Sequence, residues 1–590
     1  VRTLLKYQRK KRFFAKFTGP PRICFLQSIF PDAYFIHVIR DPRAVVNSLL
    51  KVKFWREGGG LERPWWKGLP EEYIKEWEKR NRSPVALAAL QWKRVVSLTW
   101  EEKKYVQHGH FIEIRYEDFV EKPHEYLTKV FHKVGLEDSP EAHKYISSIG
   151  KLRNMNYKYK KDLSKEDIKL IEEITRDVAN KAGYYFYKMK VLIVNKFFYL
   201  KGGSERVLFQ EREYLLNNGI EVIDFSMQNP KNLPSAYSSY FISYIDYYNV
   251  NGFFTKLKNA LKFIHSPEAV RKIKLLIQKE KPDIAHLHNI YHQLTPSIIH
   301  PLKEQGIKVV LTLHDGKLIC PTYLMLNKEM KPCLECQGKY FYKAFFKNCA
   351  SSRLRVFLLM VEAYWHKFFK SYDKVDLFIA PSQFLAKVVS KRISREKIIV
   401  LRNGINLNEY EPTYEDKGYA LYFGRLSKEK GIETLLKVHQ DIAKEIPLKI
   451  VGTGLIEDEL KTRYPRAEFL GYRTGKELKS IIARASFVVV PSEWYENCSM
   501  AVLEAMALGK PIIASRIGGL PEQVEDGRTG LLFEMGNVEE LKEKILYLWK
   551  NKDLRIEMGR EARKKAEREF SLEKHCEELL QTYKKLLQSN

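Results

Sequence analysis

The sequence predicts an α/β protein with parallel sheets that bind ligands at the carboxyl ends of their strands. Short apolar runs recur along the chain and stop at polar or turn residues, as in Met189–Asn195, Val309–Asp315 and Ala485–Ser492. Continuous apolar runs of this length are typical of parallel strands buried on both faces. In doubly wound sheets the ligand lies at the edge where such strands end.

The composition is that of a large folded protein with a strong positive charge. The chain has 590 residues, of which 45% are hydrophobic, and a formal net charge of +29. This length gives room for about four domains. No run of eighteen apolar residues appears, so no membrane-spanning helix is expected. The basic residues 1–12 lead into no apolar segment, which argues against a secretory signal, and we expect a cytoplasmic protein with mostly reduced thiols.

The positive residues are spread over the whole length. No helix-turn-helix, zinc-finger or RNA-recognition pattern accompanies them, so nucleic acid is not an expected partner. Anionic lipid, phosphate groups or acidic glycans fit the charge better. The segment Arg353–Lys370 is apolar with basic flanks. It is either a helix that lies peripherally on the inner face of the cell membrane or an ordinary helix packed on its own domain.

The first 188 residues differ in character from the rest. Residues Tyr34–Ser48 predict a buried strand, an Arg-Asp-Pro turn and a helix. Arg40 at the strand end and Ser48 in the helix can together hold a phosphate. With Phe111–Phe119 and Lys181–Tyr184, this segment resembles the 3′-phosphate-binding part of sulfotransferases that use 3′-phosphoadenosine 5′-phosphosulfate.

The resemblance to sulfotransferases is incomplete. Such enzymes open with a strand and a phosphate loop, and no Gly-rich loop of that kind precedes Arg40. Without it the leaving phosphate has no cationic stabiliser. We expect residues 1–188 to form a partial α/β module of the P-loop type, either a truncated remnant or half of a split domain, inactive by itself. The join to the rest is abrupt, and Met189 is a candidate independent start.

Two carboxylates lie eight positions apart in Glu496–Glu504. Glu496 is expected in the loop after a strand, and Glu504 about two turns into a helix that starts near Ser499. An ionised carboxylate accepts two hydroxyl donors at once, and a helix N-terminus holds phosphate. This pattern is suited to a ligand that carries both hydroxyl and phosphate groups.

Two cations five positions apart, Arg425 and Lys430, follow another predicted strand that ends at Gly424. A pyrophosphate between them and a helix N-terminus would be well neutralised. Further along, Gly509–Glu522 predicts a strand that opens into a Gly-Gly turn, where the backbone can approach a ligand closely.

Together these motifs make residues from about 189 to 590 resemble a retaining glycosyltransferase of family 4. The resemblance implies the GT-B fold, in which two Rossmann-like domains face a cleft, here 189–412 on the acceptor side and 413–590 on the nucleotide-sugar side. It implies donor-binding residues and two catalytic residues beside the reacting sugar. The donor-binding residues are Gly202, Gly203, Arg425, Lys430, Ser499 and Glu504, and the catalytic residues are His314 and Glu496.

Within this assignment Arg425 and Lys430 hold the diphosphate, Glu504 the ribose and Glu496 the transferred sugar. The implied reaction moves a sugar from a nucleotide-sugar to a glycan or lipid-linked acceptor in polysaccharide or glycoconjugate biosynthesis, and it requires no cofactor. Two alternatives stay open. The chain is either bifunctional, sulfating and glycosylating one polysaccharide, or a non-catalytic glycan-binding scaffold, which the intact motif residues argue against.

Four of the seven cysteines follow His314 closely, with the spacing C-x12-C-x2-C-x12-C. They are Cys320, Cys333, Cys336 and Cys349. The central pair has zinc-knuckle spacing, so the cluster predicts either a structural zinc site that shapes the acceptor side or free or disulfide-linked thiols. His286 and His288 are expected on opposite faces of a strand, and no role is assigned to them.

Overall fold

The computed structural model describes residues 14–17, 19–64, 68–150, 152, 154–184, 186, 189–247 and 253–588. The chain divides into two compact units, Val1–Lys188 and Met189–Asn590, each with its own hydrophobic core. The basic residues 1–12 and most of the junction at 185–188 lie outside the described residues.

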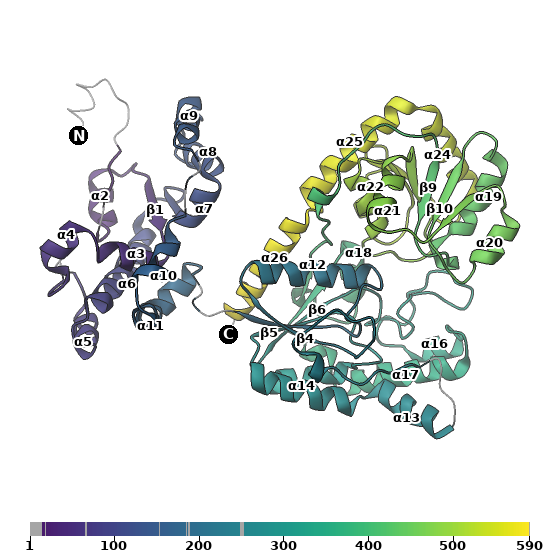
Figure 1. Ribbon diagram of the computed structural model, residues 1–590, viewed down its shortest axis with the longest axis horizontal. Coiled ribbons are helices and arrows are strands. Elements are labelled where there is room, and N and C mark those ends of the chain that lie inside the picture. The colour runs from purple at the N-terminus through teal and green to yellow at the C-terminus, as the bar shows by residue number, and fades with distance from the viewer. Residues whose placement is uncertain are drawn as a thin grey trace. The chain divides into compact units, whose positions relative to one another are not determined.

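The first unit is a two-stranded parallel sheet packed with helices (Figure 1). Its core is built around α6, whose residues Val85–Leu90 are all buried, and α6 packs on α3 and α11. The helices begin at capping residues: Asp41 accepts from the backbone of α3, Ser83 from that of α6, and Ser164 forms a capping box with Asp167 at α11. The elements are α2 (Ile23–Ile29), β1 (Phe35–Ile39), α3 (Pro42–Leu49), α4 (Lys53–Trp55), α5 (Glu71–Lys79), α6 (Pro84–Glu102), β2 (Phe111–Arg115), α7 (Tyr116–Glu121), α8 (Pro123–Lys133), α9 (Pro140–Ser148), α10 (Tyr159–Asp162) and α11 (Lys165–Lys181).

The N-terminal domain of the second unit is a six-stranded parallel sheet with helices on both faces. The strand order is β4-β3-β5-β6-β7-β8, and Val191 pairs with Ile284. This register brings the carboxyl ends of β3, β5 and β6 to one edge. The elements are β3 (Lys190–Val194), α12 (Gly203–Asn217), β4 (Glu221–Phe225), α13 (Phe253–Ile264), α14 (Pro267–Glu280), β5 (Ile284–Leu287), α15 (Ile299–Glu304), β6 (Lys308–Thr312), α16 (Tyr342–Phe346), α17 (Arg353–Phe368), β7 (Leu377–Ala380), α18 (Gln383–Val389) and β8 (Ile398–Val400).

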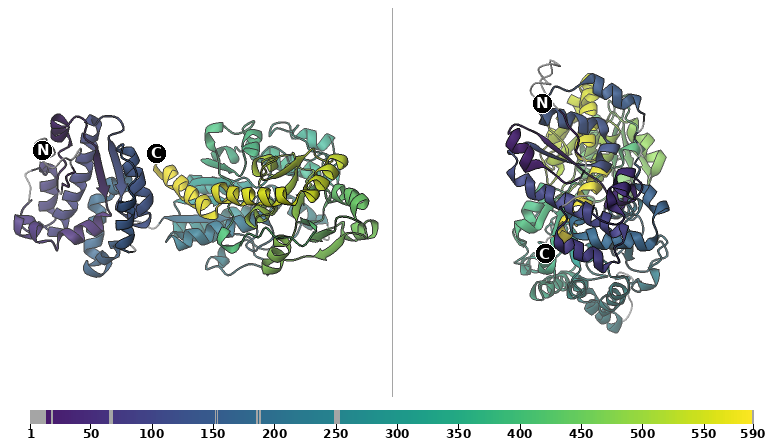
Figure 2. Two further views of the ribbon diagram at one scale, coloured as in Figure 1. Left: turned by 90° about the horizontal axis from the view of Figure 1, so that it is seen from above. Right: turned by 90° about the vertical axis from the view of Figure 1, so that its left-hand side faces the viewer.

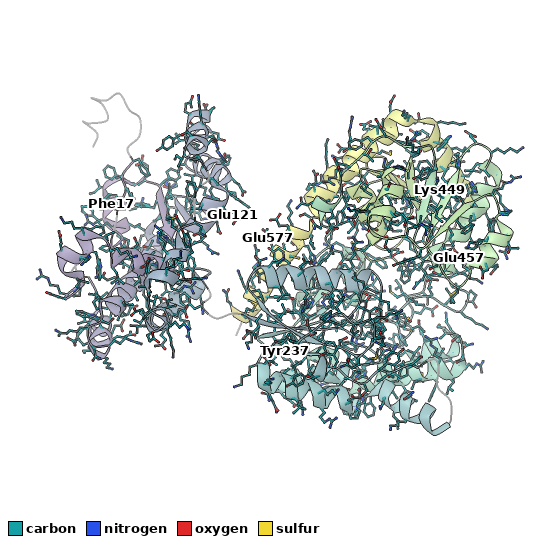
Figure 3. The ribbon with its side chains drawn as sticks, viewed as in Figure 1. Phe17, Glu121, Tyr237, Lys449, Glu457 and Glu577 are labelled. Atoms are coloured by element: carbon teal, nitrogen blue, oxygen red, sulfur yellow. The ribbon has the colours of Figure 1, made fainter. Side chains whose placement is uncertain are left out.

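The C-terminal domain repeats this architecture, with the strand order β11-β10-β9-β12-β13-β14. Tyr237, which packs against the first core, and Lys449 on β10 mark the two domains in Figure 3. The fold prediction of two Rossmann-like sheets is therefore confirmed. The elements are β9 (Ala420–Phe423), α19 (Ile432–Ile442), β10 (Leu448–Val451), α20 (Glu457–Arg463), β11 (Glu468–Gly471), α21 (Gly475–Ala483), β12 (Phe487–Val490), α22 (Met500–Ala507), β13 (Ile512–Ser515), α23 (Leu520–Gln523), β14 (Gly530–Phe533), α24 (Val538–Lys550), α25 (Lys552–Glu569) and α26 (Leu572–Gln588).

The last helix departs from the predicted domain division, which placed all of 413–590 in the C-terminal domain. Figures 1 and 2 show α25 and α26 running from that domain back to the N-terminal one. Leu579 and Tyr583 of α26 are buried in one cluster with Val191 and Ile193 of β3. The amphipathic pattern of α26 predicts a buried face, but it does not say which sheet covers that face.

None of the helices in the described residues is long and apolar enough to cross a membrane.

Candidate functional site

The loops that leave the two sheets meet in the second unit. Gly202 is the N-cap of α12, and a Cβ added at Gly203 would lie 3.4 Å from the side chain of Met500 at the start of α22. The glycine loop of one domain therefore lies against a helix N-terminus of the other. Ser499, the N-cap of α22, makes no side-chain capping bond, so the first-turn N–H groups of α22 are available to an anion.

Glu496 lies in the loop after β12, as predicted, and its carboxylate is almost fully buried. Its Oε1 accepts from Lys430 Nζ at 2.6 Å, Trp494 Nε1 at 2.8 Å and Ser492 Oγ at 2.9 Å. Burial opposes ionisation of Glu496, but Lys430 and these hydrogen bonds lower its pKa below the usual value. All of these bonds go to Oε1, so Oε2 can accept from a ligand hydroxyl.

Glu504 lies in the second turn of α22, where Oε1 receives two bonds. Arg206 of α12 donates to it at 2.6 Å and Tyr410 at 3.0 Å. Arg206 also donates to the Tyr410 hydroxyl at 2.6 Å. Arg206 thus joins the N-terminal domain to the predicted ribose-binding carboxylate, and the second oxygen of Glu504 again can accept from a ligand.

The two predicted diphosphate-binding cations come from one loop after β9. Arg425 is more than half exposed and is held by Glu429, which accepts from it at 2.6 Å. Lys430 is more buried and lies 4.9 Å from the centre of the Trp494 ring. Both cations therefore start from an ion pair with a carboxylate, which a bound diphosphate can replace.

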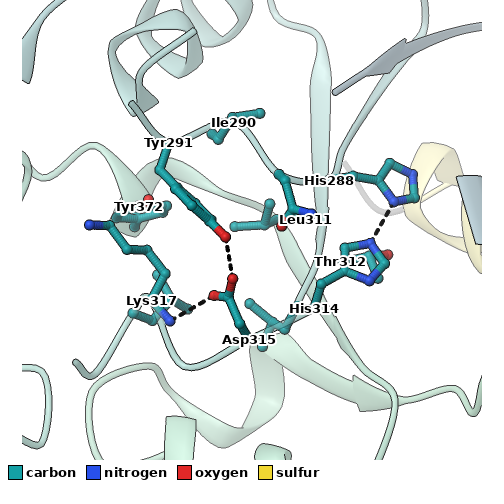
Figure 4. Close-up of a pocket in the computed structure, with 12 residues that line it drawn as sticks. His288, Ile290, Tyr291, Leu311, Thr312, His314, Asp315, Lys317 and Tyr372 are labelled. Carbon is teal, nitrogen blue, oxygen red and sulfur yellow. Dashed lines mark hydrogen bonds between the residues drawn. The ribbon is translucent and has the colours of Figure 1, made fainter. Parts of the chain in front are cut away.

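His314 lies just beyond β6 and faces His288 (Figure 4). Its Nε2 is 2.9 Å from Nδ1 of His288, and Asn497 of the C-terminal domain donates to its backbone carbonyl at 2.8 Å. Burial lowers the pKa of His314 to about 4. The imidazole is therefore neutral at physiological pH, and one of its nitrogens is committed to His288.

The prediction that His286 and His288 face opposite sides of their strand is wrong. Residues two apart on a strand share a face, and both imidazoles point to Glu211 of α12, each 3.5 Å from its Oε2. His286 also bonds Thr312 and the hydroxyl of Tyr583 on α26. His286 therefore links α26 to β6, the strand that precedes His314.

Figure 4 shows a small pocket beside His314 at the edge of the first sheet. The Tyr291 hydroxyl donates to Asp315, which also accepts from the backbone N–H of Lys317. Lys317 is buried and pairs with Glu362 of α17. Asp315 and Lys317 in the pocket lining are therefore held by partners within the protein.

The Gly518-Gly519 turn lies against the backbone of the loop that holds Glu496, and its approach to a ligand stays a prediction. A Cβ at Gly518 would lie 2.4 Å from the backbone oxygen of Glu496, and one at Gly519 would lie 1.9 Å from that of Asn497. The N–H of Gly519 also donates to the carbonyl of Glu496 at 2.6 Å. The two glycines support the loop that positions Glu496.

All four clustered cysteines line one cavity between β6 and α17. Each is a free thiol, so the alternative of disulfide linkage does not apply to this structure. Burial and the neighbouring thiols raise the pKa of Cys336 to about 12 and that of Cys349 to about 11.

In the first unit the structure joins three of the segments that carry the sulfotransferase resemblance. Arg40 donates to Asn156 at 2.8 Å and stacks on Tyr116. Asn156 in turn donates to Glu117, which also accepts from the hydroxyl of Tyr184 at 2.6 Å. Ser48 is exposed near the end of α3. These contacts hold Arg40 but do not include Ser48, so the joint binding of a phosphate by Arg40 and Ser48 stays a prediction.

Two contacts across the second unit were not predicted. Arg206 follows the recognised glycine pair, but nothing in the sequence indicates its partner Glu504. Glu522 accepts from the backbone N–H groups of Gln383 and Phe384 at 2.8 and 2.7 Å, which caps α18 of the other domain. Such pairs form between residues that are distant in sequence, and no local pattern identifies them.

Comparison with known proteins agrees with this architecture. Residues 406–565 match the family model of group 1 glycosyl transferases, and residues 201–409 match that of Glycosyltransferase Family 4. An uncharacterized glycosyltransferase of Methanocaldococcus jannaschii is 30% identical over 319 residues, which are 53% of this chain and 78% of that protein. The chain belongs to the glycosyltransferases.

Further comparisons concern the segment that precedes the glycosyltransferase and the glycosyltransferase itself. Residues 6–140 match the sulfotransferase family model, so a sulfotransferase-like segment precedes the transferase. N-acetyl-alpha-D-glucosaminyl L-malate synthase of Bacillus anthracis is 24% identical over 313 residues, covering 51% of this chain and 74% of that protein. Sucrose-phosphate synthase from Thermosynechococcus elongatus superposes with a TM-score of 0.52 at 20% identity, over 68% of this chain and 100% of that one, which supports the GT-B fold.

Proposed function

We propose that this glycosyltransferase moves a sugar from a nucleotide donor to a glycan or lipid-linked acceptor. The observation that carries the proposal is that two carboxylates of this region have the same hydrogen-bonding arrangement. Glu496 and Glu504 each bind protein through Oε1, and each keeps Oε2 for a ligand hydroxyl. Both lie beside the N-terminus of α22, where a diphosphate is favoured.

In this proposal each group has one task. Glu504 binds the ribose, and Glu496 binds hydroxyls of the transferred sugar. Lys430 and Arg425 exchange their carboxylate partners for the donor diphosphate, so the charge that develops on the leaving group is neutralised by side chains. For this reason the reaction needs no metal ion, and omission of Mg²⁺ should leave the rate unchanged.

Neutral His314 acts beside the reacting sugar. Because its pKa is about 4, it contributes a hydrogen bond rather than a positive charge at neutral pH. The bond to His288 fixes the ring orientation. Retention at the anomeric carbon is the outcome that the resemblance to family 4 implies, and nuclear magnetic resonance of the product anomer tests it directly.

A membrane-bound acceptor fits one surface of the N-terminal domain, formed by α16 and α17, which pack together along with α13 (Figure 1). On α17 one stripe is exposed: Leu354 by 78%, Phe357 by 47%, Trp365 by 41% and Phe368 by 80%. Lysine and arginine residues flank the stripe. Apolar side chains with basic flanks are suited to the headgroup region of an anionic bilayer, where each cation contributes about 1 kcal/mol.

Vesicle sedimentation tests this surface. The full chain should bind vesicles that contain an anionic phospholipid and bind purely zwitterionic vesicles less. Leu354→Ser with Phe368→Ser should abolish binding. Leu455→Ser is the matched control, because Leu455 is fully exposed on the other domain. Equal binding by the double variant and the control would reject the membrane contact.

The donor itself is tested by a thermal-shift panel of UDP-, GDP- and ADP-sugars. A ligand at 100 times its dissociation constant stabilises the folded chain by about 2.7 kcal/mol. The matching donor should then be hydrolysed slowly in the absence of acceptor. Binding of every donor without any hydrolysis or transfer would favour the non-catalytic scaffold instead.

A further inference from the structure

A second cluster of reactive side chains lies outside the sugar-transfer site, in the segment between β6 and α17. Cys320, Cys333, Cys336 and Cys349 come from a stretch of thirty residues and converge on one cavity. Cys320 and Cys336 are buried, and the other two are partly buried.

The surrounding segment has little regular secondary structure, although Leu318, Ile319 and Met325 pack in the main core of the domain. Between β6 and α17 the described regular elements are α16 and one isolated bridge, Leu326 with Pro332. Its separate core cluster contains Cys336, Phe341, Ala344, Val356 and Ala363.

The backbone of this segment is also strained. Positive φ angles occur at five non-glycine residues, each of which costs of order 1–2 kcal/mol. A cross-link within this segment would offset part of that cost. The five residues are Tyr323, Met325, Met330, Gln337 and Asn348.

We propose that the four cysteines bind one structural zinc ion as thiolates. Four thiolates complete a tetrahedral zinc site and leave no open position for a substrate, so the role is structural rather than catalytic. Each thiol loses one proton on binding, and the four thiolates with Zn²⁺ carry a net charge of −2.

Burial raises the pKa of Cys320, Cys336 and Cys349, and the positive charge and hydrogen bonds around the site act in the opposite direction. Within residues 320–349 the sequence has five lysines and two glutamates. Backbone N–H groups of Met325 and Thr322 bond the sulfur of Cys320, and that of Ala344 bonds the sulfur of Cys336. Such bonds stabilise a thiolate relative to a thiol and orient it as a ligand.

A second group of ligand atoms is less suited to a metal. Among the described residues, Glu211, His286 and His288 form the group whose ligand atoms all lie within 4.8 Å of one another. His286 is already hydrogen-bonded through both nitrogens. The cysteine sulfurs are farther apart than that group and must move inward to reach Zn–S bonds of about 2.3 Å. The four cysteines lie in irregular backbone, whereas His286 lies on β5.

Metal analysis of the full chain, expressed without an affinity tag in zinc-containing medium, tests the proposal. About one equivalent of zinc is expected, and a strong chelator should remove it and lower the melting temperature. The double variant Cys333→Ser with Cys336→Ser should hold less than half an equivalent. Cys24→Ser, at an exposed thiol of the first unit, is the control and should keep the zinc. Less than half an equivalent in the unaltered chain, or full zinc in the double variant, would overturn the proposal.

A measurement on the unaltered chain guards against a double variant that fails to fold. Exchange of zinc for Co²⁺ should give the thiolate-to-cobalt charge-transfer band and the intense visible bands of a tetrahedral tetrathiolate site. Absence of these bands at one equivalent of bound cobalt, or fewer than seven thiols titratable after denaturation in chelator, would reject the site independently.

Discussion

Charge removal at Glu496 and Glu504 should affect different kinetic constants. Glu496→Gln keeps the side-chain volume but removes the charge that accepts from Lys430 and, in the proposed complex, from the transferred sugar. A charge-assisted hydrogen bond contributes about 1.5–3 kcal/mol. If that bond strengthens as the glycosyl cation develops, kcat falls about 10- to 150-fold, at 1.36 kcal/mol for each factor of ten.

Glu504→Gln should instead raise the KM for the donor by a similar factor and leave kcat nearly unchanged. Ribose contacts form equally in the ground and transition states, so their loss weakens binding without slowing chemistry. The assay is initial rate against donor concentration at saturating acceptor, or donor hydrolysis without acceptor. Glu445→Gln, on an exposed turn of the same domain, is the control. Wild-type constants in either variant, or the two effects reversed, would refute the assignment of roles.

Three further outcomes are expected. Arg206→Ala, which removes the pair with Glu504, should weaken donor binding about 10-fold by titration, while Arg212→Ala, which breaks a pair inside one domain, should not. Burial lowers the pKa values of His288 and His314, so both side chains stay neutral in the folded state at mildly acidic pH. The unfolded state therefore binds more protons between pH 6.5 and 4, and the melting temperature should fall as the pH drops through that window. Residues 1–590 should transfer no sulfate from 3′-phosphoadenosine 5′-phosphosulfate, because no Gly-rich phosphate loop precedes Arg40 in them, and Arg40→Ala should leave sugar transfer intact. Sulfate transfer that this variant abolishes would refute the prediction.

The fold could be predicted because parallel strands carry their own signal. Runs such as Phe487–Val490 and Val191–Val194 are fully buried, and a strand buried on both faces has to be apolar at every position. The turn residues that follow each run then locate the binding edge. The same patterns predict Glu496, Lys430 and His314 in the segments that follow strands, and the structure has them there.

The errors have equally specific causes. The prediction for His286 and His288 is wrong because side chains two positions apart on a strand lie on the same face, and both imidazoles contact Glu211. The Gly518-Gly519 turn predicts a close backbone approach, and the structure shows one such partner, the backbone of Glu496, which the sequence does not indicate. A glycine pair indicates that another group approaches the backbone closely, but it does not identify that group.

The packing of α26 on the N-terminal domain could not be predicted, because its partners are distant in sequence, and this packing bears on the candidate site. His575 of α26 donates to Glu211 at 2.9 Å, and Tyr583 bonds His286. Glu211 also faces His288, which bonds His314. A helix that follows the C-terminal domain in sequence therefore supports the region of the N-terminal domain that positions His314. Because Arg206 lies on the same helix as Glu211 and reaches Glu504, a displacement of α12 would alter both His314 and Glu504. The proposed donor site thus depends on contacts between the two domains, and no segment of the sequence contains both sides of any one of them.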